Sequence, residues 1–131
     1  MRAPLCVMLI DDNPDDNFFH EREIKKSTLV NSIVTKESGE KALDHLMAKR
    51  SNTRHPDLIF LDINMPGMNG WEFLERYKSL SAELQSKAIV VMLTTSDNLS
   101  DQEKANSYVT EFRTKPLTLQ MLEEVIAQYW G

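Results

Sequence analysis

The stretch DLIFLDINMPGMNG (residues 57–70) decides how this chain folds, because it joins an apolar run to a turn through a single acidic residue. Residues 58–61 are all apolar, and Asp62 follows them directly. A carboxylate at the tip of a buried strand is costly to desolvate, so it usually has a partner or a chemical role. The turn-forming residues that come next place Asp62 at the mouth of a loop, where functional sites are commonly built; they are Pro66, Gly67, Asn69 and Gly70.

Short apolar runs like residues 58–61 recur along the chain and alternate with segments of helical spacing. Runs that are apolar throughout favour strands that are covered on both faces, as in a parallel sheet with helices on each side. Between the runs, apolar residues fall on one face of a helix, for example at Leu119, Leu122 and Ile126. The sequence therefore predicts an α/β fold of alternating strands and helices. The predicted strands are residues 5–10, 30–35, 58–61, 88–93 and 108–112.

The predicted helices begin at residues suited to capping. Asn13 can accept hydrogen bonds from the first turn of a helix, and Pro14 suits the first helical position. Asp15 and Asp16 then fall in the first turn, and we interpret them as partners of the helix dipole rather than as ligands. The other predicted caps are Ser38, Asn69 paired with Glu72, Ser100 paired with Glu103, and Thr118.

Length and composition restrict the class of protein. A chain of 131 residues fits one domain, so we expect a single domain over residues 1–131 with no output domain. Its 15 basic and 20 acidic side chains give a formal charge of −5 without a dense run of Lys and Arg, so we expect no direct DNA binding. The single cysteine, Cys6, excludes an internal disulfide, and no apolar stretch reaches the roughly 20 residues of a membrane span. We therefore expect a cytoplasmic protein without a membrane segment.

Polar residues follow the apolar runs where the strands are predicted to end. In an open parallel sheet, the ligand site lies outside these carboxyl ends. If the first and third strands are neighbours, about 4.8 Å apart, the aspartates at their ends crowd together, which is repulsive unless a cation relieves it. Hard carboxylate oxygens suit Mg²⁺, which also binds phosphate oxygens, so the cluster suggests a metal-assisted phosphoryl site. The residues at the strand ends are Asp11, Asp12, Asp62, Thr94, Thr95 and Lys115.

The order of these motifs resembles the receiver domain of bacterial two-component response regulators, the CheY-like family. The residues that carry the resemblance are Asp11–Asp12, the run LDINMPGMNG with Asp62, VVMLTT with Thr94, and TKPL with Lys115. The resemblance covers the chain from about residue 5 to about residue 130, with the four strand ends in the same order and spacing. It implies a flavodoxin-like (βα)5 doubly wound parallel sheet with strand order 2-1-3-4-5.

The resemblance also implies a role for each site residue. Asp62 would accept a phosphoryl group, and Thr94 and Lys115 would contact its oxygens. Thr94 and Phe112 would act as the conformational switch, and the Lys115–Pro116 peptide bond would be cis. The ligands of Mg²⁺ would be Asp11, Asp12, Asp62 and the backbone carbonyl of Asn64.

The implied phosphoryl donor is a histidine kinase or a phosphotransfer protein, and the implied target is a downstream partner protein. We expect this target, or a second copy of the chain in a homodimer, to bind the surface formed by the last two helices and the strand at 108–112. Such a protein would lose its phosphoryl group by hydrolysis without being a turnover enzyme.

Three alternatives stay open at this point. One is a phosphatase-like or dehalogenase-like hydrolase, although such families use an Asp-x-Asp pair and here Asp11 and Asp12 are adjacent. The second is a receiver-like module that binds its partners without phosphorylation, and the third is a fragment of a hybrid kinase. The three histidines have no metal-ligand spacing, so we expect them at the surface; they are His20, His45 and His55.

Overall fold

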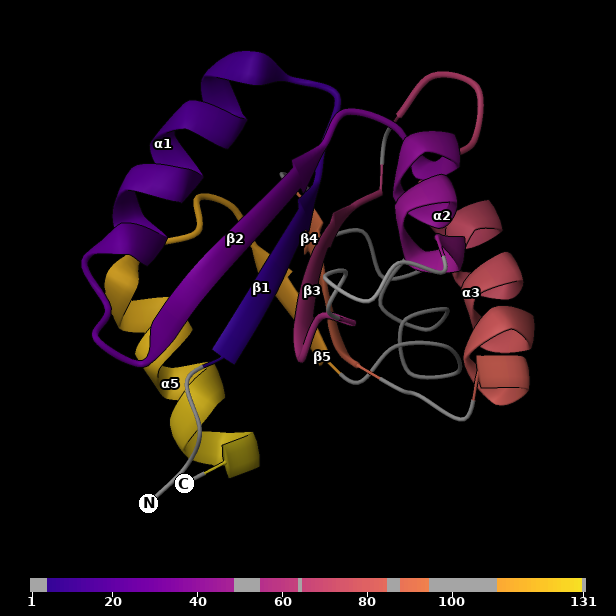
Figure 1. Cartoon of the computed structure of the whole chain (residues 1–131). Coiled ribbons are helices and arrows are strands. Elements are labelled where there is room, and N and C mark those ends of the chain that lie inside the picture. Colours follow the sequence, from indigo (N-terminus) through magenta and orange to yellow (C-terminus); the bar gives the residue numbers. More distant parts are fainter. Residues whose placement is uncertain (1–4, 49–54, 64, 85–87, 95–110, 131) are drawn as a thin grey trace.

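The computed structural model describes residues 5–48, 55–63, 65–84, 88–94 and 111–130. Within these residues five parallel strands form one sheet in the order β2-β1-β3-β4-β5, as the resemblance implies (Figure 1). The strands are β1 (Leu5–Ile10), β2 (Val30–Lys36), β3 (Leu58–Asp62), β4 (Ile89–Thr94) and β5 (Glu111–Thr114). The helices are α1 (Pro14–Lys25), α2 (Gly39–Met47), α3 (Gly70–Leu84) and α5 (Leu119–Trp130).

Helices cover both faces of the sheet, which explains why the inner strands β1, β3 and β4 are apolar along nearly all of their length. In Figure 1, α1 and α5 lie on one side of the sheet and α2 and α3 on the other. Every residue of β1 and β3 is buried, and successive side chains point to opposite faces. On the α2 and α3 side, the strands contribute Met8, Ile10, Ile59, Leu61, Val90 and Met92. On the α1 and α5 side, they contribute Leu5, Val7, Leu9, Leu58, Phe60, Val91 and Leu93.

The predicted caps are confirmed for all four described helices. The Asn13 side chain accepts hydrogen bonds from the backbone N–H groups of Asp15 and Asp16, and Ser38 accepts one from Lys41. Asn69 and Glu72 form a reciprocal capping box at 2.9 and 3.0 Å, and Thr118 accepts from the N–H of Met121. The predicted cap at Ser100, with Glu103, lies outside the described residues.

The strand predictions hold to within a few residues, and β5 differs most. We predicted this strand at 108–112, whereas it is observed at Glu111–Thr114, with residues 108–110 outside the described part of the chain. It continues through the polar residues Arg113 and Thr114 because β5 is an edge strand, where polar side chains are tolerated. None of the helices among the described residues is both long and apolar enough to cross a bilayer.

Candidate functional site

Three aspartates meet at the carboxyl ends of β1 and β3. The register pairs Ile10 of β1 with Leu61 of β3, so Asp11 and Asp62, the next residue on each strand, come side by side. Asp11, Asp12 and Asp62 each offer an oxygen atom, and these oxygens all lie within 4.8 Å of one another. Asp11 is 4% and Asp62 7% exposed, while Asp12 is half-buried. The predicted crowding of the three carboxylates is therefore observed, and we call them the acidic trio.

The backbone around Asp11 is held by several hydrogen bonds. Its N–H donates to the carbonyl of Lys36 on β2 at 3.1 Å, and its carboxylate accepts from the N–H of Asn13 at 3.0 Å. The buried amide of Asn17 donates to the carbonyl of Asp11 at 2.8 Å. These contacts tie the end of β1 to the first turn of α1, so the Asp11 carboxylate is fixed in place before any ligand binds.

Glycine at position 70 lets α3 begin directly against the end of β3. The N–H of Gly70 donates to the carbonyl of Ile63 at 2.9 Å. A Cβ atom at Gly70 would lie 2.7 Å from the carbonyl oxygen of Asp62 and 3.0 Å from the Cα of Ile63, both of which are backbone atoms. Gly70 therefore permits the close approach that positions Asp62 at the mouth of the turn.

Lys115 reaches the acidic trio from the end of β5. Its Nζ lies 2.7 Å from Asp11 Oδ2, 3.0 Å from Asp16 Oδ2 and 3.5 Å from Asp62 Oδ1, and its side chain is 10% exposed. Burial by itself lowers the pKa of Lys115, but the hydrogen bonds to Asp11 and Asp16 and the charges of Asp11 and Asp62 outweigh it, so this pKa is raised. The side chain is therefore a fixed ammonium at neutral pH.

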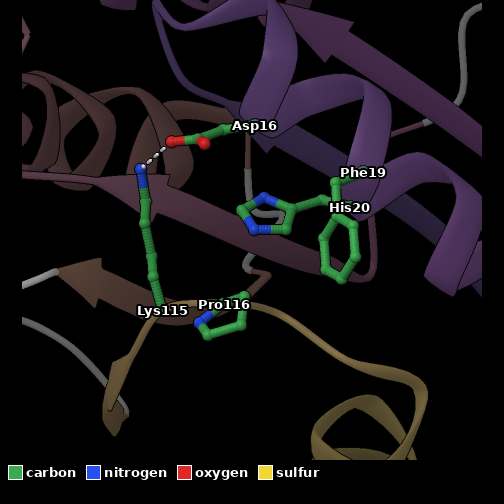
Figure 2. A pocket seen from close by; sticks show the side chains of 5 residues that line it. All are labelled: Asp16, Phe19, His20, Lys115 and Pro116. Carbon is green, nitrogen blue, oxygen red and sulfur yellow. Dashed lines mark hydrogen bonds and ion pairs between the residues drawn. The ribbon is translucent and has the colours of Figure 1, made fainter.

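An open groove of about 450 Å³ lies beside Lys115, between the start of α1 and the chain that follows β5. Figure 2 shows the lining side chains and the ion pair between Lys115 and Asp16. They are Asp16, Phe19, His20, Lys115 and Pro116. The peptide bond between Lys115 and Pro116 is cis, as the resemblance implies.

The surface prediction for His20 is wrong. His20 is 2% exposed, and burial, followed by the charge of Lys115, lowers its pKa against the opposing effects of Asp11 and Asp16. The buried residues of α1 are Asn17, His20 and Ile24, so the inner face of this helix is mostly polar and an apolar pattern cannot reveal it. The helical spacing of these three residues, counted back from the apolar Ile24, is the sequence signal that could have predicted the burial of His20.

Asp16 has a second role that the sequence did not reveal. It lies in the first turn of α1, as predicted for a partner of the helix dipole, and it also forms an ion pair with Lys115. The two residues are 99 positions apart in the sequence. Because Asp16 and His20 are four residues apart on one helix, they share a face and line the same groove.

The remaining predicted site residues are only partly described. Thr94 is the last residue of β4 and pairs with Thr114 of β5, but its side chain is not among those described. Asn64 lies outside the described residues. Phe112 of β5 is half-buried and packs against the core on the α2 and α3 side.

The donor set of the acidic trio fits a hard divalent cation. All its ligand atoms are carboxylate oxygens, which Mg²⁺ prefers over nitrogen or sulfur ligands. Lys115 brings one positive charge to the trio and Asp16 brings a fourth carboxylate, so the lysine offsets only part of the negative charge. Two buried carboxylates close to a third repel one another unless further positive charge is added.

Comparison with known proteins agrees with this arrangement. A sequence profile of the response regulator receiver domain matches residues 7–127. The chain belongs to the response regulator receiver family. Within this family it is similar in structure to a two-component response regulator from Cytophaga hutchinsonii, with 34% identity, a TM-score of 0.86 and 97% of each chain covered.

Two further receivers have sequence and structural similarity to this one. The response regulator Rcp1 of Synechocystis is 28% identical in sequence, over 97% of this chain and 89% of the length of Rcp1. The structure of Mn²⁺-bound Rcp1 aligns with a TM-score of 0.75, over 97% of this chain and 94% of the Rcp1 chain. The cyanobacterial phytochrome response regulator RcpA, in its phosphorylated form, is 30% identical, with a TM-score of 0.77 over 96% of this chain and 91% of that chain.

Proposed function

We propose that Asp62 of this receiver accepts a phosphoryl group from a phosphohistidine on a histidine kinase or phosphotransfer protein. The observation that carries this proposal is the position of Asp62: a buried carboxylate at the end of the central strand, within 4.8 Å of the other acidic oxygens and 3.5 Å from the Lys115 ammonium. A nucleophile, anionic metal ligands and a cation for the phosphoryl oxygens are the groups that phosphoryl transfer requires.

The residues that would hold Mg²⁺ are Asp11, Asp12 and Asp62, together with the backbone carbonyl of Asn64. When bound, Mg²⁺ neutralises negative charge on the phosphoryl oxygens and on the carboxylates around them. The buried Asp11 carboxylate is already oriented by the N–H of Asn13 and by Lys115, so it loses little freedom on binding a cation.

The transfer itself uses the carboxylate of Asp62 as the nucleophile. One of its oxygens attacks phosphorus as the bond from phosphorus to the donor imidazole breaks, and the electron pair of that bond returns to the imidazole nitrogen. The product is an acyl phosphate on Asp62. Later, the oxygen of a water molecule attacks phosphorus, the bond to Asp62 breaks, and inorganic phosphate leaves as the carboxylate is restored.

Lys115 and Thr94 would change their contacts when Asp62 is phosphorylated. The new phosphoryl oxygens offer Lys115 Nζ a closer partner than the Asp62 carboxylate at 3.5 Å. The hydroxyl of Thr94 would bind the same oxygens, and movement at Thr94 would shift Phe112 on the neighbouring strand. Differential contact of this kind biases the equilibrium between two conformations and exposes a different surface to a downstream partner.

Related receivers support this proposal. RcpA has been solved in a phosphorylated form and Rcp1 with Mn²⁺ bound, and Mn²⁺ has the same preference for oxygen ligands as Mg²⁺. We propose that this chain is likewise a phosphorylated switch and not a turnover enzyme. A cytoplasmic location, with a kinase and a target protein as partners, is part of the same proposal.

Intact-mass measurement after incubation with acetyl phosphate tests the proposal. We expect the wild type to gain one phosphoryl adduct in Mg²⁺ and none in EDTA. Asp62→Asn should abolish the adduct. Asp44→Asn, which removes an exposed carboxylate from α2, should leave it unchanged.

Two results would contradict the proposal in different ways. If the wild type gains no adduct and still binds its partners, the chain is an interaction module that acts without phosphorylation. If each chain consumes many molecules of acetyl phosphate without an adduct on Asp62, the chain is a hydrolase.

A further inference from the structure

The Lys115 ammonium also pairs with a carboxylate outside the acidic trio, that of Asp16. We propose that Asp16 is a positioning residue that draws Lys115 toward α1 and competes with the phosphoryl group on Asp62 for the same ammonium. This inference rests on the proposed function, because it concerns how tightly Lys115 engages a phosphorylated Asp62.

The distances from Lys115 Nζ show an unequal sharing of its hydrogen bonds. The contacts to Asp11 at 2.7 Å and Asp16 at 3.0 Å are within hydrogen-bonding range. The contact to Asp62, at 3.5 Å, is an ion pair beyond the ordinary hydrogen-bond distance. Because Asp11 and Asp16 engage two of the three N–H donors of the ammonium, oxygens carried by Asp62 must compete with these two carboxylates for its charge.

Charge and burial indicate that Asp16 is the partner that competes. Asp11 belongs to the acidic trio, so its charge is shared with any cation held there. Asp16 lies outside the trio, and its charge continues to act on Lys115 when the trio is occupied. The Asp16 side chain is 39% exposed against 6% for Asp11, so water can replace Lys115 at Asp16 at little cost.

The first turn of α1 fixes Asp16 in the position that this role needs. The Asn13 side chain accepts hydrogen bonds from the N–H groups of both Asp15 and Asp16, and Pro14 occupies the first helical position. Figure 2 shows the Asp16 carboxylate opposite the end of the Lys115 side chain, across the groove that also contains His20. Asp15, the adjacent residue in the same turn, is exposed, and among the described residues the ion pairs of Lys115 are with Asp11, Asp16 and Asp62.

This arrangement supplies a matched set of variants. Asp16→Asn removes the competing charge at constant size, and Asp16→Glu retains it. Asp15→Asn is the control, because it removes the same charge from the same helical turn without touching Lys115. Melting temperatures of all variants verify that each one folds.

The test is the affinity of each protein for beryllofluoride, a mimic of the phosphoryl group, measured by calorimetry in saturating Mg²⁺. A partly exposed ion pair predicts that Asp16→Asn binds beryllofluoride roughly two- to fivefold more tightly than the wild type. The acyl phosphate formed from acetyl phosphate should persist longer by a similar factor. Asp15→Asn and Asp16→Glu should remain close to the wild type in both measurements.

The inference is overturned if Asp16→Asn binds beryllofluoride no more tightly than the wild type. It is also overturned if Asp15→Asn changes the affinity as much as Asp16→Asn does, because a general effect of charge would then explain both changes. If the wild type binds beryllofluoride normally in such an experiment, the proposed function stands and only the role of Asp16 is lost. A wild type that binds no beryllofluoride in Mg²⁺ would instead overturn the proposed function, and this inference with it.

Discussion

Replacing Lys115 with methionine, which has similar bulk and no charge, should destabilise the chain and make its stability more dependent on divalent cations. Lys115 Nζ lies within 3.5 Å of three carboxylates, and its side chain is 10% exposed. The variant leaves Asp11 and Asp62 buried without this counter-charge.

The size of the effect follows from burial. Removing one partner of a fully buried ion pair costs about 3–5 kcal/mol. Because Asp16 is 39% exposed and the groove beside Lys115 is open, water screens part of this charge, and we expect Lys115→Met to lower the free energy of unfolding by about 2–3 kcal/mol. For a chain of this size that corresponds to a fall in melting temperature of about 6–12 °C.

Magnesium should reverse part of this loss. Since the variant has no ammonium competing for the carboxylates, saturating Mg²⁺ should stabilise it by about 1 kcal/mol more than it stabilises the wild type, equivalent to roughly fivefold tighter binding. Thermal unfolding followed by circular dichroism, in EDTA and in Mg²⁺, measures both effects. The control is Lys25→Met, whose exposed lysine should contribute less than about 0.5 kcal/mol. An unchanged melting temperature of Lys115→Met in EDTA, or equal stabilisation of variant and wild type by Mg²⁺, would refute the reasoning.

Three further predictions concern glycine packing, a buried hydrogen bond and a buried histidine. Gly70→Ala should lower the free energy of unfolding by about 1–3 kcal/mol and slow phosphorylation, because the added Cβ meets the backbone of Asp62. Gly39→Ala should lower it less, because there the Cβ meets the flexible end of the Met68 side chain. Urea unfolding compares the two variants. Tyr77→Phe should cost about 1–2 kcal/mol in the same assay without changing the response to Mg²⁺, because the backbone N–H of Ala88, which donates to the Tyr77 hydroxyl at 2.8 Å, loses its acceptor. The pKa of His20 is lowered in the folded chain by burial and then by Lys115, so its contribution to stability is present above its unfolded pKa of about 6.5 and is lost as the pH falls toward the folded pKa. His20→Gln should therefore reduce the decline in stability between about pH 7 and pH 5, and an unchanged decline would contradict this.

The inner strands could be predicted from the sequence because each has a distinct local signal, whereas the order of the strands was implied by the family resemblance. Strands buried on both faces are apolar throughout, and β1 matches its predicted range of residues 5–10. The caps could be predicted because Asn13, Ser38 and Thr118 act through hydrogen bonds within one helical turn. The end of the edge strand β5 was predicted at residue 112 instead of Thr114, because its burial is partial and its apolar signal correspondingly weak.

The acidic trio could be predicted because the end of an apolar run marks the edge of a parallel sheet. Once β1 and β3 are neighbours, the backbone alone brings Asp11 and Asp62 together. The groove beside it could not be predicted in this way. The burial of His20 and the ion pair of Asp16 depend on how α1 packs near the end of β5, and the polar inner face of α1 leaves no apolar pattern from which to infer that packing.

The most direct test of the central claim, that the acidic trio is a divalent cation site, is a titration of the wild type with Mg²⁺ followed by ¹H–¹⁵N NMR. We predict saturable shifts from a single site, concentrated at the amides of residues 10–13 and 61–63, and their loss in Asp11→Asn. Shifts that are absent, that do not saturate, or that spread over exposed acidic residues elsewhere would contradict the account.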